Sequence, residues 1–327
     1  MSAVEVPRSP QPACRLSVVV PCFNEAECIE AFHARAKSAC ELLAGDAYEI
    51  VFVDDGSRDN TWPLIQSLAA ANPRVVGVKL MRNHGHQLAA TAGLQTSRGQ
   101  RVLLIDADLQ DPPELMGDMW ALMDKGADVV YGKRTSREGE SWFKRASASL
   151  FYRLLMRMTD VAIPVDTGDF RMMDRKVVDI LNSMPEHHRF LRGMVSWIGG
   201  RQVPLNYERL SRFAGRTKYP LKKMVLFAVD AITGFSIVPL RLAFWIGLVA
   251  AMMAAGLLAY VFIGWLSGET VVGWTSMMAV ITFFAGVQLA VLGVIGEYLG
   301  RLVHESKRRP MFLIETLIGS DREIPRS

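Results

Sequence analysis

Short apolar runs alternate with amphipathic stretches through the first part of the chain. The runs have the length and β-branched content of buried strands and occur at Leu16–Val20, Tyr48–Val53, Val75–Leu80, Val102–Ile105 and Ala127–Tyr131. The stretches between them have helical spacing and predict helices over 24–43, from Asp59 or Asn60 through Ala71, over 85–96 and over 113–125. This alternation predicts an α/β fold with a doubly wound, mostly parallel sheet.

Two long stretches near the C-terminus contain no Asp, Glu, Lys or Arg. They are Leu242–Gly268 and Thr270–Gly296. Each is longer than the roughly 20 residues that a helix needs to cross the hydrocarbon core of a bilayer. A buried hairpin of a soluble protein is the alternative, but two adjacent stretches of this length favour a membrane. The mean hydropathy of +0.17 is also high for a soluble enzyme.

The charges around these stretches predict their orientation. Arg241 precedes the first span, whereas Arg301 and the basic run 307–309 follow the second. The connecting loop 265–274 holds one Glu and no Lys or Arg. The positive-inside rule therefore places both termini and the catalytic part in the cytoplasm. Residues 1–12 lack a signal-peptide core. We expect a two-span protein of the inner (cytoplasmic) membrane.

A further amphipathic stretch precedes the first span. Residues 220–235 carry apolar side chains near helical spacing, with Lys222 and Lys223 beside them. This pattern predicts a helix on the membrane surface, with a core helix as the alternative. The expected organisation is a flexible N-terminus 1–15, a catalytic domain 16–218, an amphipathic juxtamembrane helix 219–238, a transmembrane hairpin 239–303 and a cytoplasmic tail 304–327.

Acidic residues follow three of the predicted strands. Pro21–Glu25 follows the first strand, Asp54 and Asp55 the second, and Asp106 and Asp108 the fourth. Because right-handed β-α-β units bring such strand ends to one edge, we expect these residues around one crevice. Carboxylates so placed repel one another unless cations intervene. By itself the Asp-x-Asp pair fits a divalent ion with phosphates and a solvated turn equally well.

The sequence lacks the motifs that are typical of several other functional classes. It contains no Gly-x-Gly-x-x-Gly after the first strand, no P-loop, no Gly-x-Ser-x-Gly and no His-Glu-x-x-His. The four cysteines lack zinc-site spacing and are expected to be structural. The net charge of +4 is mild, so anionic lipid is a better partner than nucleic acid. His84 and His86 are expected to be solvated or to contact substrate, with metal binding as the alternative.

Several motifs occur in the order of one enzyme family. They are Val20-Pro21-Cys22-Phe23-Asn24-Glu25, Asp54-Asp55-Gly56-Ser57-Arg58-Asp59, Asp106-Ala107-Asp108-Leu109-Gln110, Asp166-Thr167-Gly168-Asp169-Phe170-Arg171, and 212–219 before the first span. With the two spans, the chain resembles the GT-A fold glycosyltransferases of family 2, and more narrowly the polyprenyl-phosphate type (bactoprenol-phosphate glucosyltransferases and dolichol-phosphate mannose synthase). The resemblance runs from about residue 16 through the second span.

The resemblance implies a nucleotide-sugar site and a metal ion. Mg²⁺ or Mn²⁺ is expected on Asp108, with Asp106 and Gln110 assisting, and would stabilise the charge on the leaving nucleoside diphosphate. A plain turn role is the alternative for Gln110. The residues expected to bind the donor are Pro21, Phe23, Asn24, Glu25, Asp54, Asp55, Asp106 and Arg134.

The acceptor implied by the resemblance is a polyprenyl phosphate. Such a phosphate is largely ionised at neutral pH, so it needs orientation and charge neutralisation more than deprotonation. Asp166 and Asp169, with Asp108, are expected to be catalytic, yet a carboxylate beside a phosphate is unfavourable without an intervening cation. A base role for Asp166 or Asp169 is therefore left open. The cations expected on the phosphate, rather than only on anionic lipid, are Arg171, Arg212, Arg216 and Lys218.

The expected reaction is inverting transfer of a sugar, with UDP-glucose the first choice, to undecaprenyl phosphate at the cytoplasmic membrane face. The product would be a lipid-linked monosaccharide for cell-envelope glycan modification. GDP-mannose, UDP-galactose, UDP-N-acetylglucosamine and aminoarabinose donors are alternatives. A processive synthase would carry more spans and a Gln-x-x-Arg-Trp motif, which this chain lacks. A silent membrane scaffold is the alternative from another class. The resemblance also implies a homo-oligomer, with a tetramer favoured.

Overall fold

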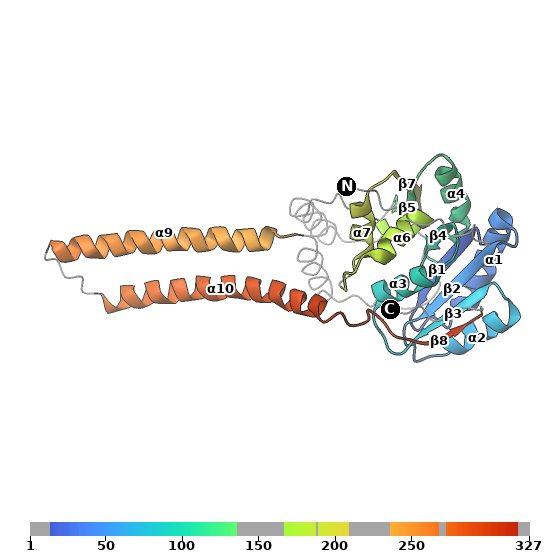
Figure 1. Cartoon of the computed structure of the whole chain (residues 1–327), viewed down its shortest axis with the longest axis horizontal. Helices are drawn as coiled ribbons and strands as arrows, with labels where there is room; N and C mark the ends of the chain where they lie inside the picture. Colours follow the sequence, from blue (N-terminus) through green and yellow to red (C-terminus); the bar gives the residue numbers. More distant parts are fainter. Residues whose placement is uncertain (1–13, 136–166, 188, 209–235, 268–272, 320–327) are drawn as a thin grey trace, which may run out of the picture. The chain divides into compact units, whose positions relative to one another are not determined.

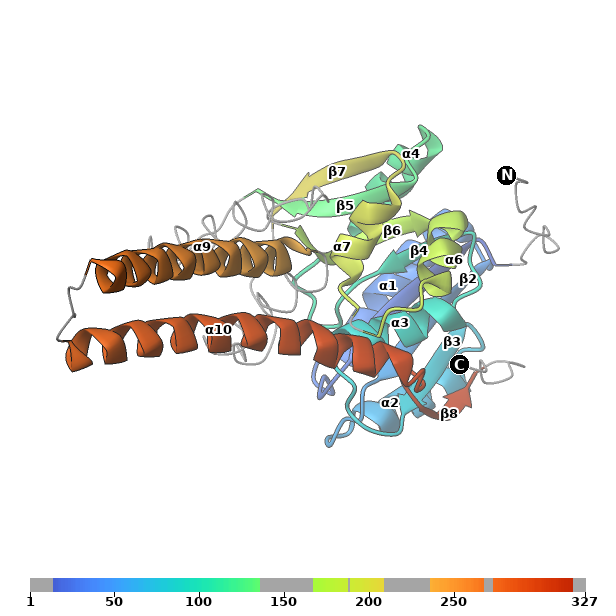
Figure 2. The same ribbon diagram turned by 60° about the vertical axis from the view of Figure 1, so that its left-hand side comes forward.

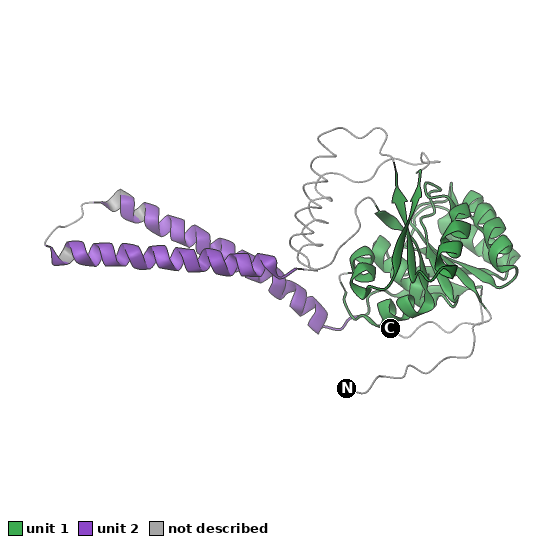
Figure 3. Ribbon diagram, turned by 90° about the horizontal axis from the view of Figure 1, so that it is seen from above, with its two compact units in different colours: residues 1–149, 161–220, 310–327 green, residues 150–160, 221–309 purple. Residues whose placement is uncertain are grey.

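The computed structural model describes residues 14–135, 167–187, 189–208, 236–267 and 273–319. These residues fall into two compact units, shown in green and purple in Figure 3. The first unit holds the strands and most of the helices, and the second holds two long apolar helices. Asp166, Arg212, Arg216 and Lys218, with nearly all of the expected juxtamembrane helix, lie outside the described residues.

The first unit is built on an eight-stranded sheet with the order β7-β5-β6-β4-β1-β2-β3-β8 (Figure 1). Its centre is parallel, because β1 pairs with β2 and β4, and β2 with β3. β6 and β8 run antiparallel to their neighbours. The strands are β1 Leu16–Cys22, β2 Tyr48–Asp54, β3 Val75–Leu80, β4 Arg101–Leu104, β5 Val129–Arg134, β6 Thr167–Asp174, β7 Gln202–Tyr207 and β8 Ile314–Ile318.

Helices cover both faces of this sheet. Val18, Val20 and Phe52 share a core with α1 and α4, whereas a side chain at Gly93 of α3 would meet Val19 on the other face. Every residue of β1 and β2 is buried as a result. The sheet is the GT-A-like α/β core expected from the sequence. The helices are α1 Ile29–Ala44, α2 Thr61–Ala71, α3 His86–Thr96, η1 Pro113–Leu115, α4 Met116–Asp124, α6 Arg175–Ser183 and α7 Leu191–Ile198.

The first helix begins later than its apolar spacing predicts. The sequence predicts a start at Asn24, but α1 starts at Ile29. Asn24 has a φ of 56°, a left-handed conformation that cannot continue a helix. Residues 24–28 instead form the loop at the carboxyl end of β1, next to the loop that follows β2. The backbone N–H groups of Asn24, Glu25 and Ala26 donate to side chains of the loop after β2 and of the start of α2, so the two loops are held together.

Strand β8 closes the sheet with residues that the sequence assigned to a tail. It lies along β3 in both views (Figure 1 and Figure 2). Glu315 pairs with Lys79 at 3.0 Å, and Met81 donates its backbone N–H to the carbonyl of Leu313 at 2.9 Å. Phe312 is buried just before the strand. The chain therefore returns to the catalytic sheet after its apolar helices.

The second unit contains helices α9 Val238–Leu266 and α10 Trp274–Ser306, which lie side by side. Their apolar segments, Val238–Gly264 and Ala279–Ser306, have 27 and 28 residues, and none of the most apolar window of either is buried. A core helix of a soluble protein would be mostly buried. Length, composition and exposure thus indicate a membrane-associated protein, as the sequence predicts.

Candidate active site

The loop after β1 carries the first group of predicted donor-binding residues. Pro21 is buried within β1, and Phe23 lies just beyond the strand with 37% of its surface exposed. The backbone N–H of Asn24 donates to the hydroxyl of Ser57 at 3.0 Å, and its side-chain oxygen accepts from the N–H of Arg58 at 2.8 Å. These bonds join the loops after β1 and β2, so the structure brings the first two motifs together.

The adjacent carboxylates after β2 face different partners. Asp54 accepts the N–H of Ser57 on one oxygen at 3.2 Å, and its buried Oδ2 has no hydrogen-bond partner among the described residues. Asp55 accepts the N–H groups of His84 at 2.6 Å and Gly85 at 2.9 Å, which holds the loop before α3. Burial raises the pKa of both carboxyls. Asp54 is therefore the better placed of the two to accept a ligand hydrogen bond.

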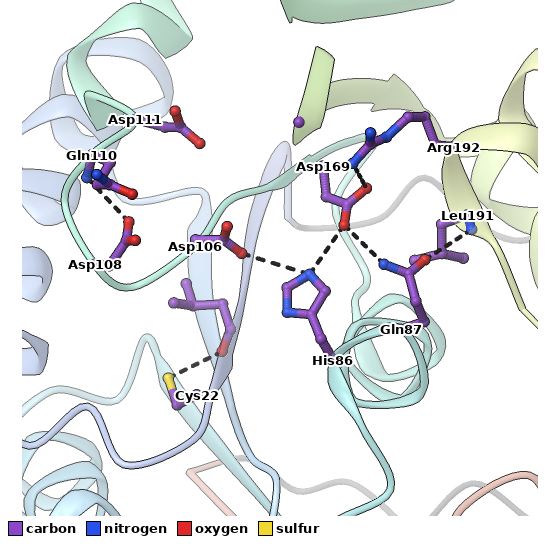
Figure 4. A network of polar contacts seen from close by, with 12 residues as sticks. Cys22, His86, Gln87, Asp106, Asp108, Gln110, Asp111, Asp169, Leu191 and Arg192 are labelled. Carbon is purple, nitrogen blue, oxygen red and sulfur yellow. Dashed lines mark hydrogen bonds and ion pairs between the residues drawn. The ribbon is translucent and has the colours of Figure 1, made fainter. Parts of the chain in front are cut away.

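The Asp-x-Asp loop follows the end of β4. Asp108 accepts the backbone N–H of Gln110 at 3.1 Å across Leu109, which has a φ of 59° (Figure 4). Such a conformation is costly for a leucine and fixes the loop in one shape. Asp106 is 36% exposed and lies 3.6 Å from the ring of His86. Both carboxylates thus belong to a partly exposed turn that Asp108 braces with its own hydrogen bond.

The electrostatics of Asp106 favour a cation nearby. Burial raises the pKa of its carboxyl, and the carboxylates of Asp169, Asp111 and Asp108 raise it further, while His86 lowers it. Within the described part of the chain, no three His, Cys, Asp or Glu side chains converge as a metal cage. Mg²⁺ in proteins commonly uses one or two carboxylates together with substrate phosphates and water. Asp106 and Asp108 fit an ion of that kind, because the remaining ligands would come from the substrate.

Asp169 on β6 lies among hydrogen-bond donors and cations (Figure 4). Its Oδ2 accepts from the side-chain amide of Gln87 at 2.8 Å and lies 3.2 Å from Nε2 of His86. Its Oδ1 lies 3.4 Å from Arg192 and 3.8 Å from Arg171. Burial alone would raise the pKa of Asp169, but Arg192, His86 and Arg171 together hold it well below its usual range. The side chain is therefore an ionised carboxylate at neutral pH.

His86 connects Asp169 with the Asp-x-Asp loop. Burial would lower the pKa of its imidazole, but Asp106 and Asp169 outweigh this effect and raise the pKa to about 9. The side chain of Arg171 is only 4% exposed, and this burial lowers its pKa to about 10 although Asp169 acts in the opposite direction. The predicted acceptor residue Arg171 and the predicted metal ligand Asp106 therefore lie in one network, linked by two side chains.

Arg134, a predicted donor-binding residue, lies beside the same strand. Its Nε donates to the hydroxyl of Tyr207 at 3.4 Å, and its Nη2 lies 3.9 Å from Asp111, which also accepts from Tyr207. A Cβ on Gly168 would be 2.8 Å from that Nη2 atom. The carbonyl of Gly168 also accepts from Arg171 at 3.1 Å. The absent side chain of Gly168 thus lets Arg134 approach β6, the strand to which Arg171 itself belongs.

Sequence reasoning missed several members of this site. Gln87 and Arg192 bind Asp169, and Asp111 and Tyr207 hold Arg134, but none was among the predicted site residues. One signal was available for Arg192, because a charged residue interrupts the apolar stretch 190–198. The predicted residues Asp166, Arg212, Arg216 and Lys218 lie outside the described residues, so the structure does not place them.

Comparison with known proteins identifies the same two units. The model of Glycosyl transferase family 2 matches residues 17–181, and the model of the GtrB C-terminal hairpin matches residues 238–302. The uncharacterized glycosyltransferase YkcC of Bacillus subtilis is 43% identical over 310 residues, which cover 94% of this chain and 95% of that protein.

Two further relatives have names that state an activity. The bactoprenol glucosyl transferase of Shigella phage SfV is 39% identical over 302 residues, covering 92% of this chain and 98% of the relative. The prophage bactoprenol glucosyl transferase homolog of Escherichia coli is 38% identical over 307 residues, with 92% and 98% coverage. The strand-end motifs, the sheet and the apolar hairpin all agree with this assignment, and the chain belongs to glycosyltransferase family 2.

Proposed function

We propose that the protein transfers a sugar, with glucose from UDP-glucose the first candidate, to a polyprenyl phosphate at the cytoplasmic face of the membrane. The observation that carries this proposal is the position of a carboxylate loop and an arginine cluster at the strand ends of one sheet. The same chain is 38–39% identical, over 92% of its length, to proteins named as bactoprenol glucosyl transferases. Bactoprenol is itself a polyprenyl alcohol.

The donor would lie across the ends of β1, β2 and β4. The unpartnered Oδ2 of Asp54 would accept a hydrogen bond from the nucleoside, next to Asn24 and Phe23. Asp106 and Asp108, with Gln110 beside them, would hold Mg²⁺ or Mn²⁺ together with the diphosphate. When bound, the ion stabilises the negative charge that develops on the leaving nucleoside diphosphate.

The acceptor would enter from the arginine side of the site. A phosphate monoester is a ready nucleophile at neutral pH, so orientation by cations matters more than removal of a proton. Arg171 donates to the carbonyl of Gly168, and Arg134 lies where a side chain at Gly168 would be, which suits a phosphate that attacks the sugar of the donor. Arg212, Arg216 and Lys218 are proposed to bind the same phosphate near the membrane surface.

The reaction can be tested on membranes that contain the full-length protein. They would be incubated with undecaprenyl phosphate, Mg²⁺ and one radiolabelled nucleotide sugar at a time, and the lipid fraction would be analysed for a glycolipid. We expect a labelled lipid-linked monosaccharide with UDP-glucose, formed at least about 100-fold more slowly by membranes with the Asp108→Asn variant. Failure of every nucleotide sugar in the panel to label the lipid would overturn the proposal.

A further inference from the structure

Arg192 extends the site beyond the residues that the family motifs contain. It lies on α7, and its Nη2 is 3.4 Å from Oδ1 of Asp169, on the side opposite Gln87 (Figure 4). The side chain is 17% exposed, so it is accessible although mostly buried. A guanidinium has five N–H donors, and the contact with Asp169 uses one nitrogen only. The remaining donors are available to a ligand.

Two arginines beside Asp169 each have a buried donor atom without a hydrogen-bond partner among the described residues. These atoms are Nε of Arg171 and Nε of Arg192. Arg171 is only 4% exposed, so solvent reaches little of it. A buried donor without a partner is costly, and such groups in native proteins commonly bind a water, an ion or a substrate. Both arginines contact the same oxygen of Asp169, so one ligand could approach both.

The charges around Asp169 favour an anion. Two guanidinium groups, those of Arg171 and Arg192, lie 3.8 and 3.4 Å from the Oδ1 atom of this single carboxylate. A divalent ion on Asp106 and Asp108 would add further positive charge. A phosphate group supplies several acceptor oxygens and matches the planar fork of arginine.

Asp169 is oriented as an acceptor rather than as a proton shuttle. The backbone N–H of Leu191 donates to Oε1 of Gln87 at 2.9 Å, which fixes the orientation of the Gln87 amide. The amide must then present its NH₂ group to Oδ2 of Asp169. With arginines on Oδ1, every partner of this carboxylate among the described residues can act as a donor. Such surroundings suit a fixed anion that holds cations in place.

We propose that Arg192, positioned by Asp169 together with Arg171, binds a phosphate group of one of the two substrates. The proposal rests on the proposed function for the identity of those substrates. The shared chemistry is a phosphate oxyanion, which belongs either to the diphosphate of the donor or to the phosphate of the acceptor. Asp169 is then a positioning residue, and its negative charge serves to hold Arg192 where the phosphate binds.

Direct binding separates the two phosphates and does not need turnover. Binding of UDP with Mg²⁺, and of farnesyl phosphate in detergent micelles, would be measured by calorimetry on purified full-length protein. We expect Arg192→Ala to lower the affinity for one of the two ligands by roughly 10- to 100-fold, the usual cost of losing a hydrogen bond to a charged group. Arg192→Lys keeps the positive charge but loses the planar fork of the guanidinium, so its affinity should lie between those of the wild type and Arg192→Ala. Arg201→Ala, on an exposed arginine at the β5–β7 end, is the matched control.

A double-mutant cycle tests the role of Asp169. If Asp169 acts through Arg192, the combined Asp169→Asn and Arg192→Ala variant should be little worse than Arg192→Ala alone. If Asp169 is a base, its loss should lower kcat and multiply with the Arg192 effect. Multiplied losses, or unchanged binding of both ligands by Arg192→Ala, would overturn the proposal. If Asp169→Asn fails to fold, the binding measurements on the Arg192 variants still test the phosphate contact by themselves.

The two proposals fail in different ways. If the protein transfers no sugar from any donor, the proposed function fails, yet the binding of UDP and farnesyl phosphate can still be compared between the wild type and Arg192→Ala. If sugar transfer occurs but Arg192→Ala binds both ligands as tightly as Arg201→Ala does, only the role of Arg192 fails.

Discussion

At the scale of single residues, the two carboxylates of the Asp-x-Asp loop differ in their surroundings. Asp106 faces the cationic ring of His86, which links it to Asp169. Asp108 caps its own loop by accepting the N–H of Gln110. A metal ion on Asp106 must share that carboxylate with His86, whereas Asp108 lies on the far side of the loop from the histidine (Figure 4). We therefore expect Asp108 to be the stronger ligand of the two.

This difference can be measured with Asp108→Asn. The amide keeps the shape of the side chain but loses the charge that holds a divalent ion, so we expect kcat to fall by about 100-fold or more. The residual activity should no longer rise with Mg²⁺ concentration. Asp118→Asn, on an exposed acid of α4, is the control and should behave as the wild type. A variant that kept its magnesium dependence would place the metal elsewhere.

Gly168 offers a second test at this scale. In Gly168→Ala the new methyl group would meet Nη2 of Arg134 at 2.8 Å, and the end of that flexible side chain would have to move. We expect kcat/KM to fall roughly 10- to 100-fold, as small displacements of substrate-orienting groups do, with little change in melting temperature. Gly117→Ala meets nothing within 4 Å and should leave both quantities unchanged. Equal activity of the two variants would remove Arg134 from the site.

How far the sequence predicts the site depends on the kind of residue. Asp54, Asp106 and Asp108 follow apolar strands, so their position at the sheet edge can be read from the chain. Arg192 reaches the site only because α7 packs near β6, and neither the strand pattern nor the spacing of charges contains that contact. Gln87 is equally hidden, since its partner Asp169 is 82 positions away. Local patterns predict strand ends well and tertiary partners poorly.

At the scale of elements, local sequence patterns likewise predict the early strands better than the late ones. The first five strands each contain an apolar run and lie close to their predicted positions, with β2 and β3 starting where predicted. β6 and β7 carry charged or polar residues on one side, which breaks the run. β8 pairs with β3 across 236 positions of sequence, between Lys79 and Glu315. No local pattern in a short segment after a long apolar helix reveals such a partner.

The edge formed by β8 can be tested with two glycines that both have positive φ. Gly319 after β8 and Gly45 after α1 have φ values of 84° and 56°, so alanine is strained at either position. At Gly319 the added Cβ would also lie 2.0 Å from the carbonyl oxygen of Val75, whereas at Gly45 nothing lies within 4 Å. Gly319→Ala should therefore lower the melting temperature more. Equal losses would argue against the β3–β8 edge.

At the scale of the whole molecule, the orientation of the apolar hairpin is the main prediction from charge. Ser267 at the loop end of α9 and Ser306 at the end of α10 are both exposed and donate to helix carbonyls, at 3.0 Å each. In intact cells, a membrane-impermeant maleimide should label Ser267→Cys, and should label Ser306→Cys only after permeabilisation. The reverse pattern would place the catalytic unit outside.

The native thiols give this experiment a low background. Cys22, Cys28 and Cys40 are buried, and burial raises the pKa of Cys28 to about 11 and the pKa values of the other two well above their usual range. A protonated, buried thiol reacts slowly with maleimide. Cys14 is partly exposed, so a Cys14→Ser background removes the remaining signal.

The position of β8 also fixes the order in which this protein can be completed during synthesis. Its residues, 314–318, leave the ribosome after both apolar helices, while its partner β3 is made near the start. Throughout the insertion of the hairpin, the nascent sheet therefore has an open edge at β3. An open edge of this kind invites pairing with another chain. Translation that stops inside the hairpin would release a catalytic domain with that edge uncovered, so the pairing of β8 with β3 is the closing step in the assembly of this sheet.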